Sequence, residues 1–376
     1  MTIICFSHLR WNFVYQRPQH LLSRFAKNYT VYFIEEPIFH EDGDCYTILN
    51  SEENVHVIKQ YLSNKDDSDV YKRQHDLLKI FLQKQAGSEY IFWYYSPMMY
   101  LFSKQFDPAL IVYDCMDELS AFKFAPAGLK ETEQELLDAA DVVFTGGHSL
   151  YQAKKHLHHN IYPFPSSIEK EHFAKARINN QQPADQQNIP YPRLGFFGVL
   201  DERFDIELIR KVATKKPDWN FILLGPIVKI NPDDLPRNAN IFYLGGKSYN
   251  ELPAYVSGWD IALVPFALNE STRYISPTKT PEYLAAGKPV ISTAITDVVN
   301  PYGEENLASI IHSAEEFIKA AEKILKQENK NAWLKKVDAF LKNNSWDNTF
   351  AEMNGIIKKG LAGKKQVINS KTTTYV

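Results

Sequence analysis

Two residues in the stretch SPTKTPEYLAAGKPVIST, residues 276–293, combine a cation and a carboxylate at the start of a short predicted helix. Lys279 adds a positive charge to the free backbone N–H groups of a helix start, which attract anions such as phosphate. Glu282 follows three residues later, where a phosphate would repel it and the hydroxyl groups of a ribose would not. The pair therefore predicts a site for a nucleoside diphosphate. The alternative is a solvated helix end with both side chains in water.

Local signals set the ends of this helix. Ser276 and Pro277 suit a cap and a first helical residue, whereas Thr280 before Pro281 offers a later start, and Gly287 ends the helix before the next apolar run. With either start, the free N–H groups point out of the carboxyl edge of a sheet.

A second cationic position follows a predicted strand in GFFGVLDERFD, residues 195–205. Gly198 lies in the turn after the strand, and Arg203 precedes a helix that Asp205 is expected to cap. A guanidinium at this place suits a phosphate. The glycines lack the spacing of the dinucleotide fingerprint, which argues against an NAD oxidoreductase.

The elements that must position these residues alternate between short apolar runs and helical patterns, which is typical of parallel sheets built from βαβ units. A Gln/Asn-rich stretch with three prolines, residues 176–193, separates two such series and is typical of a linker. We expect an α/β protein of two doubly wound, Rossmann-like domains that face a cleft. The expected boundaries are an N-terminal domain at 1–178, a linker at 179–192, a C-terminal domain at 193–330, helices at 331–358 that pack back across the junction, and a disordered tail at 361–376.

Composition sets limits on the partners. The 376 residues exceed what one hydrophobic core usually serves, and 44% of them are hydrophobic. A formal charge of −3 argues against nucleic acid as the main partner. Three widely spaced cysteines fit a reducing compartment, and the apolar N-terminus lacks a basic leader, so we expect a cytoplasmic protein. No window approaches the ~20 apolar residues of a bilayer span.

The chain resembles GT-B fold glycosyltransferases in several motifs. The motifs GFFGVLDERFD, ELPAYVSGWDIALVPF and SPTKTPEYLAAGKPVIST are similar to the donor-binding domain of the large retaining group that includes bacterial cell-envelope transferases. The motifs FSHLRWNFVYQRPQHLLSRFA, VYDCMDELSAF, ADVVFTGGHSL and FPSSIEKEHF resemble the N-terminal domain of teichuronic-acid-type transferases. The resemblance extends to about residue 350.

The resemblance implies roles for single residues. Glu282 would hold the ribose, Arg203 and Lys279 the diphosphate, and the loop Gly245–Ser248 would border the base. Tyr274 stands where many of these families carry a first glutamate. This departure leaves the sugar-contacting role open, and Asn269, Glu270, Ser271 or Arg273 of the same loop could take it. The expected donor side comprises Gly198, Arg203, Gly245, Gly246, Lys247, Asn269, Arg273, Tyr274, Ser276, Pro277, Thr278, Lys279 and Glu282.

The N-terminal half is expected to hold the acceptor. Polar and aromatic residues follow the first predicted strand and open the next helix, at the carboxyl edge of the sheet, and these are His8, Arg10, Trp11, Asn12 and Arg17. An aromatic ring among polar donors suits a sugar, although a tryptophan after a strand is as often part of the core. Asp117 lies where the resemblance places a residue on the donor sugar, and it is expected to be catalytic with Arg203 and Lys279. Its alternative is to cap a turn.

Charge indicates the mechanism. Cleavage of the anomeric bond to a diphosphate leaves negative charge on the leaving group, which Arg203 and Lys279 would stabilise, so we expect no metal and no cofactor. The triplet Asp42–Asp44 and the histidines of 154–160 are not expected to bind metal. Retention of configuration is implied by the resemblance alone.

The resemblance also implies a nucleotide-sugar donor, UDP-linked in preference to GDP-linked, and a glycan or lipid-linked acceptor. A basic stretch from Lys154 to Arg177 is expected to contact anionic lipid at the inner face of the cell membrane. Two other functions fit the same plan: a nucleotide-sugar epimerase, and a non-catalytic nucleotide-sugar-binding partner.

Overall fold

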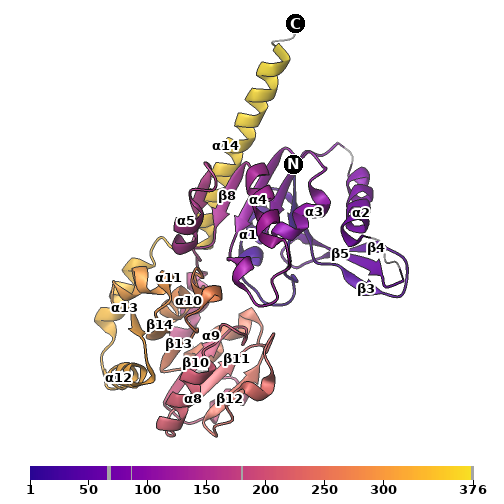
Figure 1. The fold of residues 1–376 in the computed structure, drawn as a ribbon. Helices are drawn as coiled ribbons and strands as arrows, with labels where there is room; N and C mark the ends of the chain where they lie inside the picture. The colour runs from indigo at the N-terminus through magenta and orange to yellow at the C-terminus, as the bar shows by residue number, and fades with distance from the viewer. Residues whose placement is uncertain (66–68, 86, 179–180, 374–376) are drawn as a thin grey trace.

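The computed structural model describes residues 1–65, 69–85, 87–178 and 181–373. It contains two sheets, one in each half of the chain, with helices packed against them (Figure 1). The N-terminal half, indigo to magenta in Figure 1, and the C-terminal half, pink to orange, meet across a junction that lies near the middle of the molecule.

The N-terminal sheet has the order β3-β5-β2-β1-β6-β7-β8-β9, with β4 paired to β5. All pairs within it are parallel except β4 with β5. The apolar runs of β1, β2, β6 and β8 are buried, as expected for parallel strands covered by helices on both faces. Its strands are β1 (Thr2–Phe6), β2 (Thr30–Ile34), β3 (Ile38–His40), β4 (Cys45–Asn50), β5 (Val55–Ser63), β6 (Tyr90–Tyr94), β7 (Leu110–Cys115), β8 (Val142–Thr145) and β9 (Ile161–Pro163).

The C-terminal sheet is parallel throughout, with the order β12-β11-β10-β13-β14-β15. Asp205 caps α8 (Ile206–Lys215) by accepting a hydrogen bond from Leu208 N at 2.9 Å, as the sequence predicts. The strands are β10 (Arg193–Phe197), β11 (Asn220–Leu224), β12 (Ile241–Gly245), β13 (Ile261–Val264), β14 (Val290–Thr293) and β15 (Ala308–Ile311).

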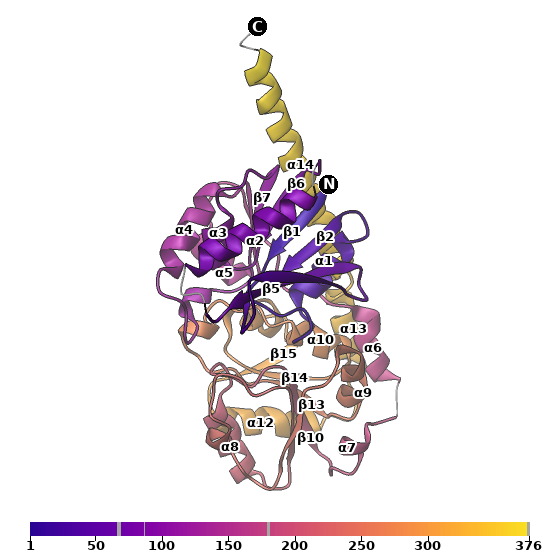
Figure 2. The same cartoon turned by 90° about the vertical axis from the view of Figure 1, so that its right-hand side faces the viewer.

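Helices connect the strands and cover the sheets (Figure 2). Those before β10 are α1 (Arg17–Phe25), α2 (Val70–Lys84), α3 (Tyr100–Ser103), α4 (Leu129–Ala139), α5 (His148–Lys154), α6 (Lys170–Ala174) and α7 (Ala184–Gln187). Those after it are α8 (Ile206–Lys215), α9 (Leu252–Ser257), α10 (Lys279–Ala285), α11 (Thr296–Val298), α12 (Ala314–Leu325), α13 (Asn331–Phe340) and α14 (Trp346–Thr373).

The stretch expected to be a linker packs on the C-terminal domain. Trp259 Nε1 donates to Gln186 Oε1 at 2.9 Å, and Gln186 Nε2 donates to the carbonyl of Tyr255 at 2.9 Å. Ile168, Phe173 and Ala176 belong to the same apolar core as β10 to β15. The structural boundary therefore lies before residue 179. The composition suggested a linker because it does not reveal the hydrogen bonds that fix this glutamine-rich segment.

The C-terminal helices lie on both halves. α13 places Val337 in the core of the C-terminal domain, whereas α14 returns to the N-terminal sheet and buries Trp346, Met353 and Ile357 there. The helix then continues to Thr373 and projects from the body in both views, in place of the expected disordered tail (Figures 1 and 2). No proline interrupts it, and a glycine inside a helix costs only about 1 kcal/mol. Residues 374–376 lie outside the described residues.

Direct bonds join the two halves beside the cleft. Asp297 of the C-terminal domain accepts hydrogen bonds from the backbone N–H groups of His148 and Ser149, both at 2.9 Å, at the start of α5. Ser166 Oγ donates to the carbonyl of Ser276 at 2.8 Å. The Ser166 bond holds the segment before α10 against the N-terminal domain, and the Asp297 bonds hold α11 there.

Candidate active site

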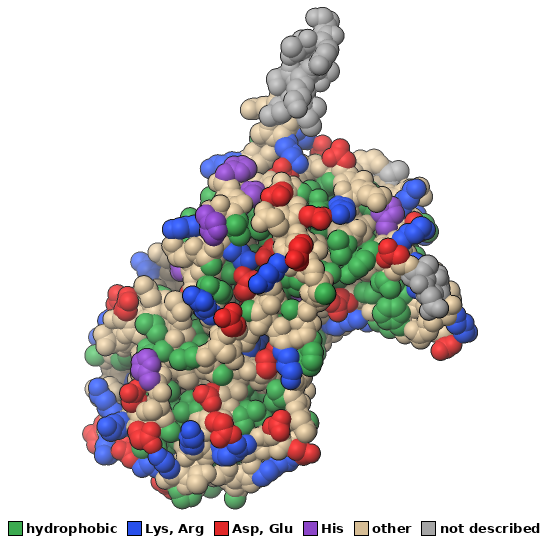
Figure 3. Space-filling view, viewed as in Figure 1, with side chains coloured by type: hydrophobic (Ala, Val, Ile, Leu, Met, Phe, Trp, Pro, Cys, Tyr) green, Lys and Arg blue, Asp and Glu red, His purple; other side chains and the backbone are tan. Residues whose placement is uncertain are grey.

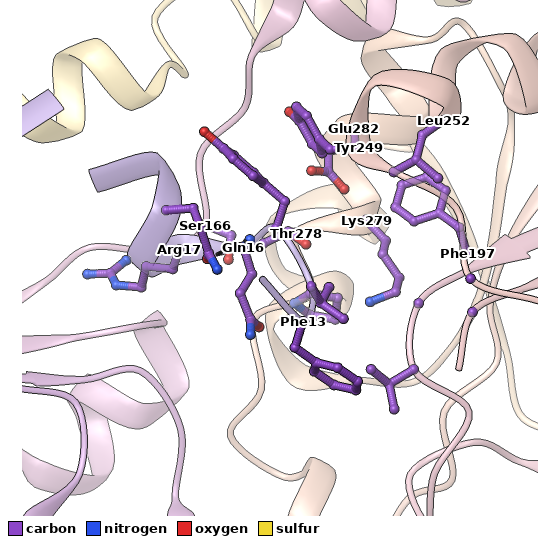
Figure 4. Close-up of a pocket in the computed structure, with 18 of the residues that line it drawn as sticks. Phe13, Gln16, Arg17, Ser166, Phe197, Tyr249, Leu252, Thr278, Lys279 and Glu282 are labelled. Atoms are coloured by element: carbon purple, nitrogen blue, oxygen red, sulfur yellow. Dashed lines mark hydrogen bonds between the residues drawn. The ribbon is translucent and has the colours of Figure 1, made fainter. Parts of the chain in front are cut away.

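A cavity of about 780 Å³ lies between the carboxyl ends of the two sheets. The space-filling view shows the molecule hollowed between its halves on the side of β3 and β5 (Figure 3). Lys279 and Glu282 reach into the cavity from the C-terminal domain, and Phe13 and Gln16 reach into it from the N-terminal domain (Figure 4). The cavity thus joins the two expected binding sides in one space.

Lys279 is the first residue of α10, and Thr278 is its cap residue. The helix therefore starts neither at Pro277 nor after Thr280. Pro281 fits inside the first turn, because the N–H that proline lacks would have no partner there. The Lys279 amino group lies 5.6 Å from the ring centres of both Phe196 and Phe266. Burial, with a further contribution from the nearby Arg203, lowers the pKa of Lys279 to about 8.

Glu282 lies one turn further along α10 and is only 4% exposed. Its Oε2 atom has no hydrogen-bond partner among the described residues. Burial raises the pKa of this carboxyl to about 8, against the effect of Lys279. A buried acceptor without a partner is costly, so an incoming hydroxyl donor would satisfy it.

Arg203 reaches the cavity from the turn after β10, and Asp201 binds its guanidinium. The bonds from Nε and Nη2 to the Asp201 carboxylate are 2.6 to 3.1 Å long. The guanidinium also lies 5.3 Å from the ring centre of Phe122, a residue of the N-terminal domain. The pairing fixes the direction of the cation, and it leaves Lys279 as the less neutralised charge.

Asp117 follows β7 and lines the cavity from the N-terminal side. Burial raises its pKa to about 6, although Arg203, Arg17 and Lys279 act to lower it. This places the expected catalytic carboxyl near both expected diphosphate cations.

The loop that carries Asp117 is anchored by Lys154. The Lys154 amino group binds Glu118 and Glu133, each at 2.8 Å, and is buried. Arg177, at the far end of the expected basic stretch, donates to the carbonyl of Ala285 at 2.7 Å. The expectation that Lys154 contacts anionic lipid is therefore wrong, because a buried internal ion pair occupies its charge.

Two of the expected acceptor-side residues are used inside the fold. Arg17 is buried and binds Asp114 through Nε and Nη2 at 2.8 to 3.1 Å, and in Figure 4 it points away from the cavity. Arg10 pairs with Glu35 at 3.2 Å and does not line the cavity. Both positions are corrected to structural roles, because an arginine beside a buried carboxylate forms a paired charge in preference to an open one.

The remaining acceptor-side positions differ. Trp11 touches the cavity but is buried against Phe33, while its Nε1 donates to Glu53 at 3.3 Å. Asn12 is exposed and lines the cavity. His8 does not line it, and burial lowers its pKa to about 4.

Some of the residues expected on the donor side line the cavity, and others do not. Gly198, Gly246, Lys247, Ser276, Pro277 and Thr278 line the cavity. Lys247 is paired to Asp185 at 2.7 Å. Gly245, Asn269, Arg273 and Tyr274 do not line it; the side chain of Asn269 instead accepts bonds from the N–H groups of the turn that follows it.

Tyr274 packs against the core of the N-terminal domain and so takes no place in the cavity. Glu270, the other carboxylate of this loop, is exposed and is also absent from the lining. Within the described residues, the loop 269–274 therefore brings no side chain to the cavity that would replace the missing first glutamate.

Sequence reasoning missed the aromatic contact that closes one side of the cavity. Tyr249 stacks on Tyr15 at 4.7 Å and on His172 at 4.3 Å between ring centres. His20 meets the edge of the same ring and stacks on Trp346. These residues come from four distant segments, and only the position of Tyr249 beside the expected base loop signalled a role.

Other cavity residues that the sequence did not single out include Phe13, Gln16, Glu53 and Glu169. Among the described residues, no group of three or more His, Cys, Asp or Glu side chains is placed to hold a metal ion. No helix in the described part of the chain is both long and apolar enough to cross a membrane.

Comparisons with known proteins agree with this geometry. Residues 191–327 match the family of glycosyl transferases group 1. The chain is 25% identical over 289 residues, 71% of each chain, to TuaH of Bacillus subtilis (strain 168), whose name describes a glycosyltransferase of teichuronic acid biosynthesis.

Solved structures share the fold over nearly the whole chain. Sucrose-phosphate synthase from Thermosynechococcus elongatus superposes with a TM-score of 0.73 at 16% identity, covering 96% of this chain and 99% of that chain. Anabaena HepE, in complex with UDP and glucose, gives a TM-score of 0.64 at 13% identity and covers 95% of this chain and 99% of its own. These likenesses confirm the expected fold class.

Proposed function

We propose that this chain, a group 1 glycosyltransferase with the GT-B fold, moves a sugar from a nucleoside-diphosphate sugar to a glycan or lipid-linked acceptor in cell-envelope polysaccharide synthesis. One observation carries the proposal. Lys279, Arg203 and the unpartnered carboxylate of Glu282 converge on one cavity at the carboxyl ends of two parallel sheets. A diphosphate and a ribose are the groups that this set of charges fits.

The donor would be held by the C-terminal domain. Lys279 and Arg203 would bind the diphosphate, Glu282 would accept the ribose hydroxyls, and the backbone of Gly246 and Ser248 would border the base. The likeness to structures that contain UDP, HepE among them, supports UDP over GDP as the nucleotide.

The chemistry requires a stabilised leaving group. As the anomeric bond breaks, negative charge grows on the diphosphate, and the amino group of Lys279, which forms no ion pair with the described residues, would receive it. Asp117 would face the positive charge that develops on the sugar. We propose that no metal takes part, and that the configuration is retained, the latter on the sequence resemblance alone.

A thermal-unfolding panel tests this function. UDP, GDP, ADP, CDP, dTDP and NAD are added to the protein in the presence of EDTA, and a ligand that binds only the folded state must raise the Tm. We expect UDP to give the largest shift, Lys279→Ala to abolish it, and Lys215→Ala, an exposed lysine on α8, to preserve it.

Stabilisation by NAD alone, or equal responses from both lysine variants, would contradict the proposal. Incubation of the donor without acceptor separates the epimerase alternative, since an epimerase would isomerise the sugar in that reaction and a transferase would not.

A further inference from the structure

We propose that the acceptor group held in the cavity is an uncharged sugar, stacked on Phe13, and not a phosphorylated sugar. The inference rests on the proposed function, because it names the second substrate of the same cavity. It is carried by the charges and the exposed ring on the N-terminal wall of the cavity.

The N-terminal wall has no open cation. Among the described residues that line it, Arg17 is the one arginine or lysine, and Asp114 and the carbonyl of Phe164 take its guanidinium. The carboxylates of Glu53, Asp117 and Glu169 lie on the same wall. A phosphate dianion placed there would be repelled by these charges and would find no positive partner.

The cations of the opposite wall are assigned to the donor or are paired inside the protein. Lys247 is bound to Asp185. Among the described residues, Lys279 and Arg203 are the other cations of that wall, and both would bind the donor diphosphate. An acceptor phosphate would therefore compete with the donor for the same two side chains.

Phe13 is placed to hold an apolar sugar face. The ring is 51% exposed, although most large apolar side chains of the chain are buried, and Figure 4 shows it extending into the cavity on the side facing Lys279. The amide of Gln16 extends into the same space, and Asn12 lines it. An aromatic face flanked by amides matches the C–H face and the hydroxyl groups of a neutral sugar.

The loop that presents Phe13 is fixed at its base. Glu35 accepts a bond from the backbone N–H of Trp11 at 2.8 Å, and Gln19 Nε2 donates to the Trp11 carbonyl at 2.6 Å. The N–H of Phe13 itself donates to the carbonyl of Arg10 at 3.2 Å. The backbone that carries the ring is thus held in place before a sugar arrives, which lowers the entropy cost of binding.

Saturation-transfer NMR on the full chain loaded with UDP tests the inference. The probes are the methyl glycosides of glucose, galactose and N-acetylglucosamine, each compared with the 6-phosphate of its sugar. We expect at least one glycoside to bind, and its 6-phosphate counterpart to bind at least fivefold more weakly. Phe13→Ala should weaken the glycoside at least fivefold, whereas Phe39→Ala, an equally exposed ring on β3 that does not line the cavity, should not.

Tighter binding of a 6-phosphate, an unchanged affinity in Phe13→Ala, or no binding by any glycoside would each overturn the inference. Titration of UDP into the same samples separates this result from the proposed function. If UDP binds and the sugars behave otherwise than expected, only the acceptor assignment falls; if UDP does not bind, both fall.

Discussion

The side chain of Lys279 lies directly against Gly198. A Cβ atom added at Gly198 would be 2.3 Å from Lys279 Cε and 2.8 Å from its Nζ. The φ angle of Gly198 is 139°, in a region that other residues rarely adopt. The turn after β10 and the first residue of α10 therefore depend on each other, although 80 positions separate them in the sequence.

Gly198→Ala should displace the Lys279 amino group and weaken UDP binding about tenfold or more, because the diphosphate loses its least neutralised cation. Calorimetric titration of UDP measures the loss, and circular dichroism verifies the fold. Gly43→Ala, where a Cβ meets nothing within 4 Å, is the matched control. Equal affinities in the two variants would show that Lys279 does not need this glycine.

Glu282→Gln should weaken UDP binding and reduce the loss of folding stability at rising pH. The wild-type carboxyl has a pKa of about 8 when folded, above its ordinary 4.5, so its contribution to stability is present below pH 4.5 and is lost as the pH rises through 8. Glutamine does not titrate, so the variant should lose less stability than the wild type between pH 5 and 8 in urea unfolding. Its affinity for UDP should fall about tenfold, since one oxygen that could accept a ribose hydroxyl is replaced by an amide N–H donor. A variant that binds UDP as well as the wild type would exclude Glu282 from the ribose.

Donor binding should weaken at alkaline pH. The pKa of Lys279 is lowered to about 8, by burial first and then by Arg203, so the amino group is charged below that pH and increasingly neutral above it. The diphosphate of UDP is already ionised at pH 8, because the second pKa of a phosphate group is about 6. In the Glu282→Gln background, which removes the second group that titrates near pH 8, Kd for UDP should rise up to about tenfold per pH unit above 8. Lys279→Arg should flatten the profile, and a flat wild-type profile would contradict the assignment.

Strand ends and short motifs predicted much of the cavity. Lys279, Glu282 and Arg203 were selected because each stands beside a predicted strand end or helix start, and parallel strands bring such ends to one edge. The two-sheet fold was predicted for the same reason, from the alternation of strands and helices.

Pairings between distant residues were not predictable. The bond of Arg17 to Asp114 spans 97 positions, and the stack of Tyr15 on Tyr249 joins opposite domains. The sequence does not distinguish an arginine in an internal ion pair from one that is available to a ligand, so Arg10 and Arg17 were assigned to the acceptor. The helix to Thr373 was missed because a polar composition does not separate a solvated helix from a coil.

Lys154→Met should destabilise the protein by about 3 to 5 kcal/mol, because it leaves the buried Glu133 and the half-buried Glu118 without their cation. The neighbouring Lys155 is exposed, and Lys155→Met should change the free energy of unfolding by no more than about 0.5 kcal/mol. Urea unfolding compares the two variants. Similar small effects in the two variants would show that the Lys154 charge is exposed to solvent. The expected contact of Lys154 with anionic lipid would then be restored.

The location of the donor is tested most directly by a crystal structure of the protein with UDP. We expect UDP to occupy the cavity between the two sheets, with Lys279 Nζ about 3 Å from a β-phosphate oxygen and the Glu282 carboxyl group bonded to a ribose hydroxyl. UDP bound outside this cavity, or bound in it with the diphosphate away from both Lys279 and Arg203, would contradict the proposed donor site.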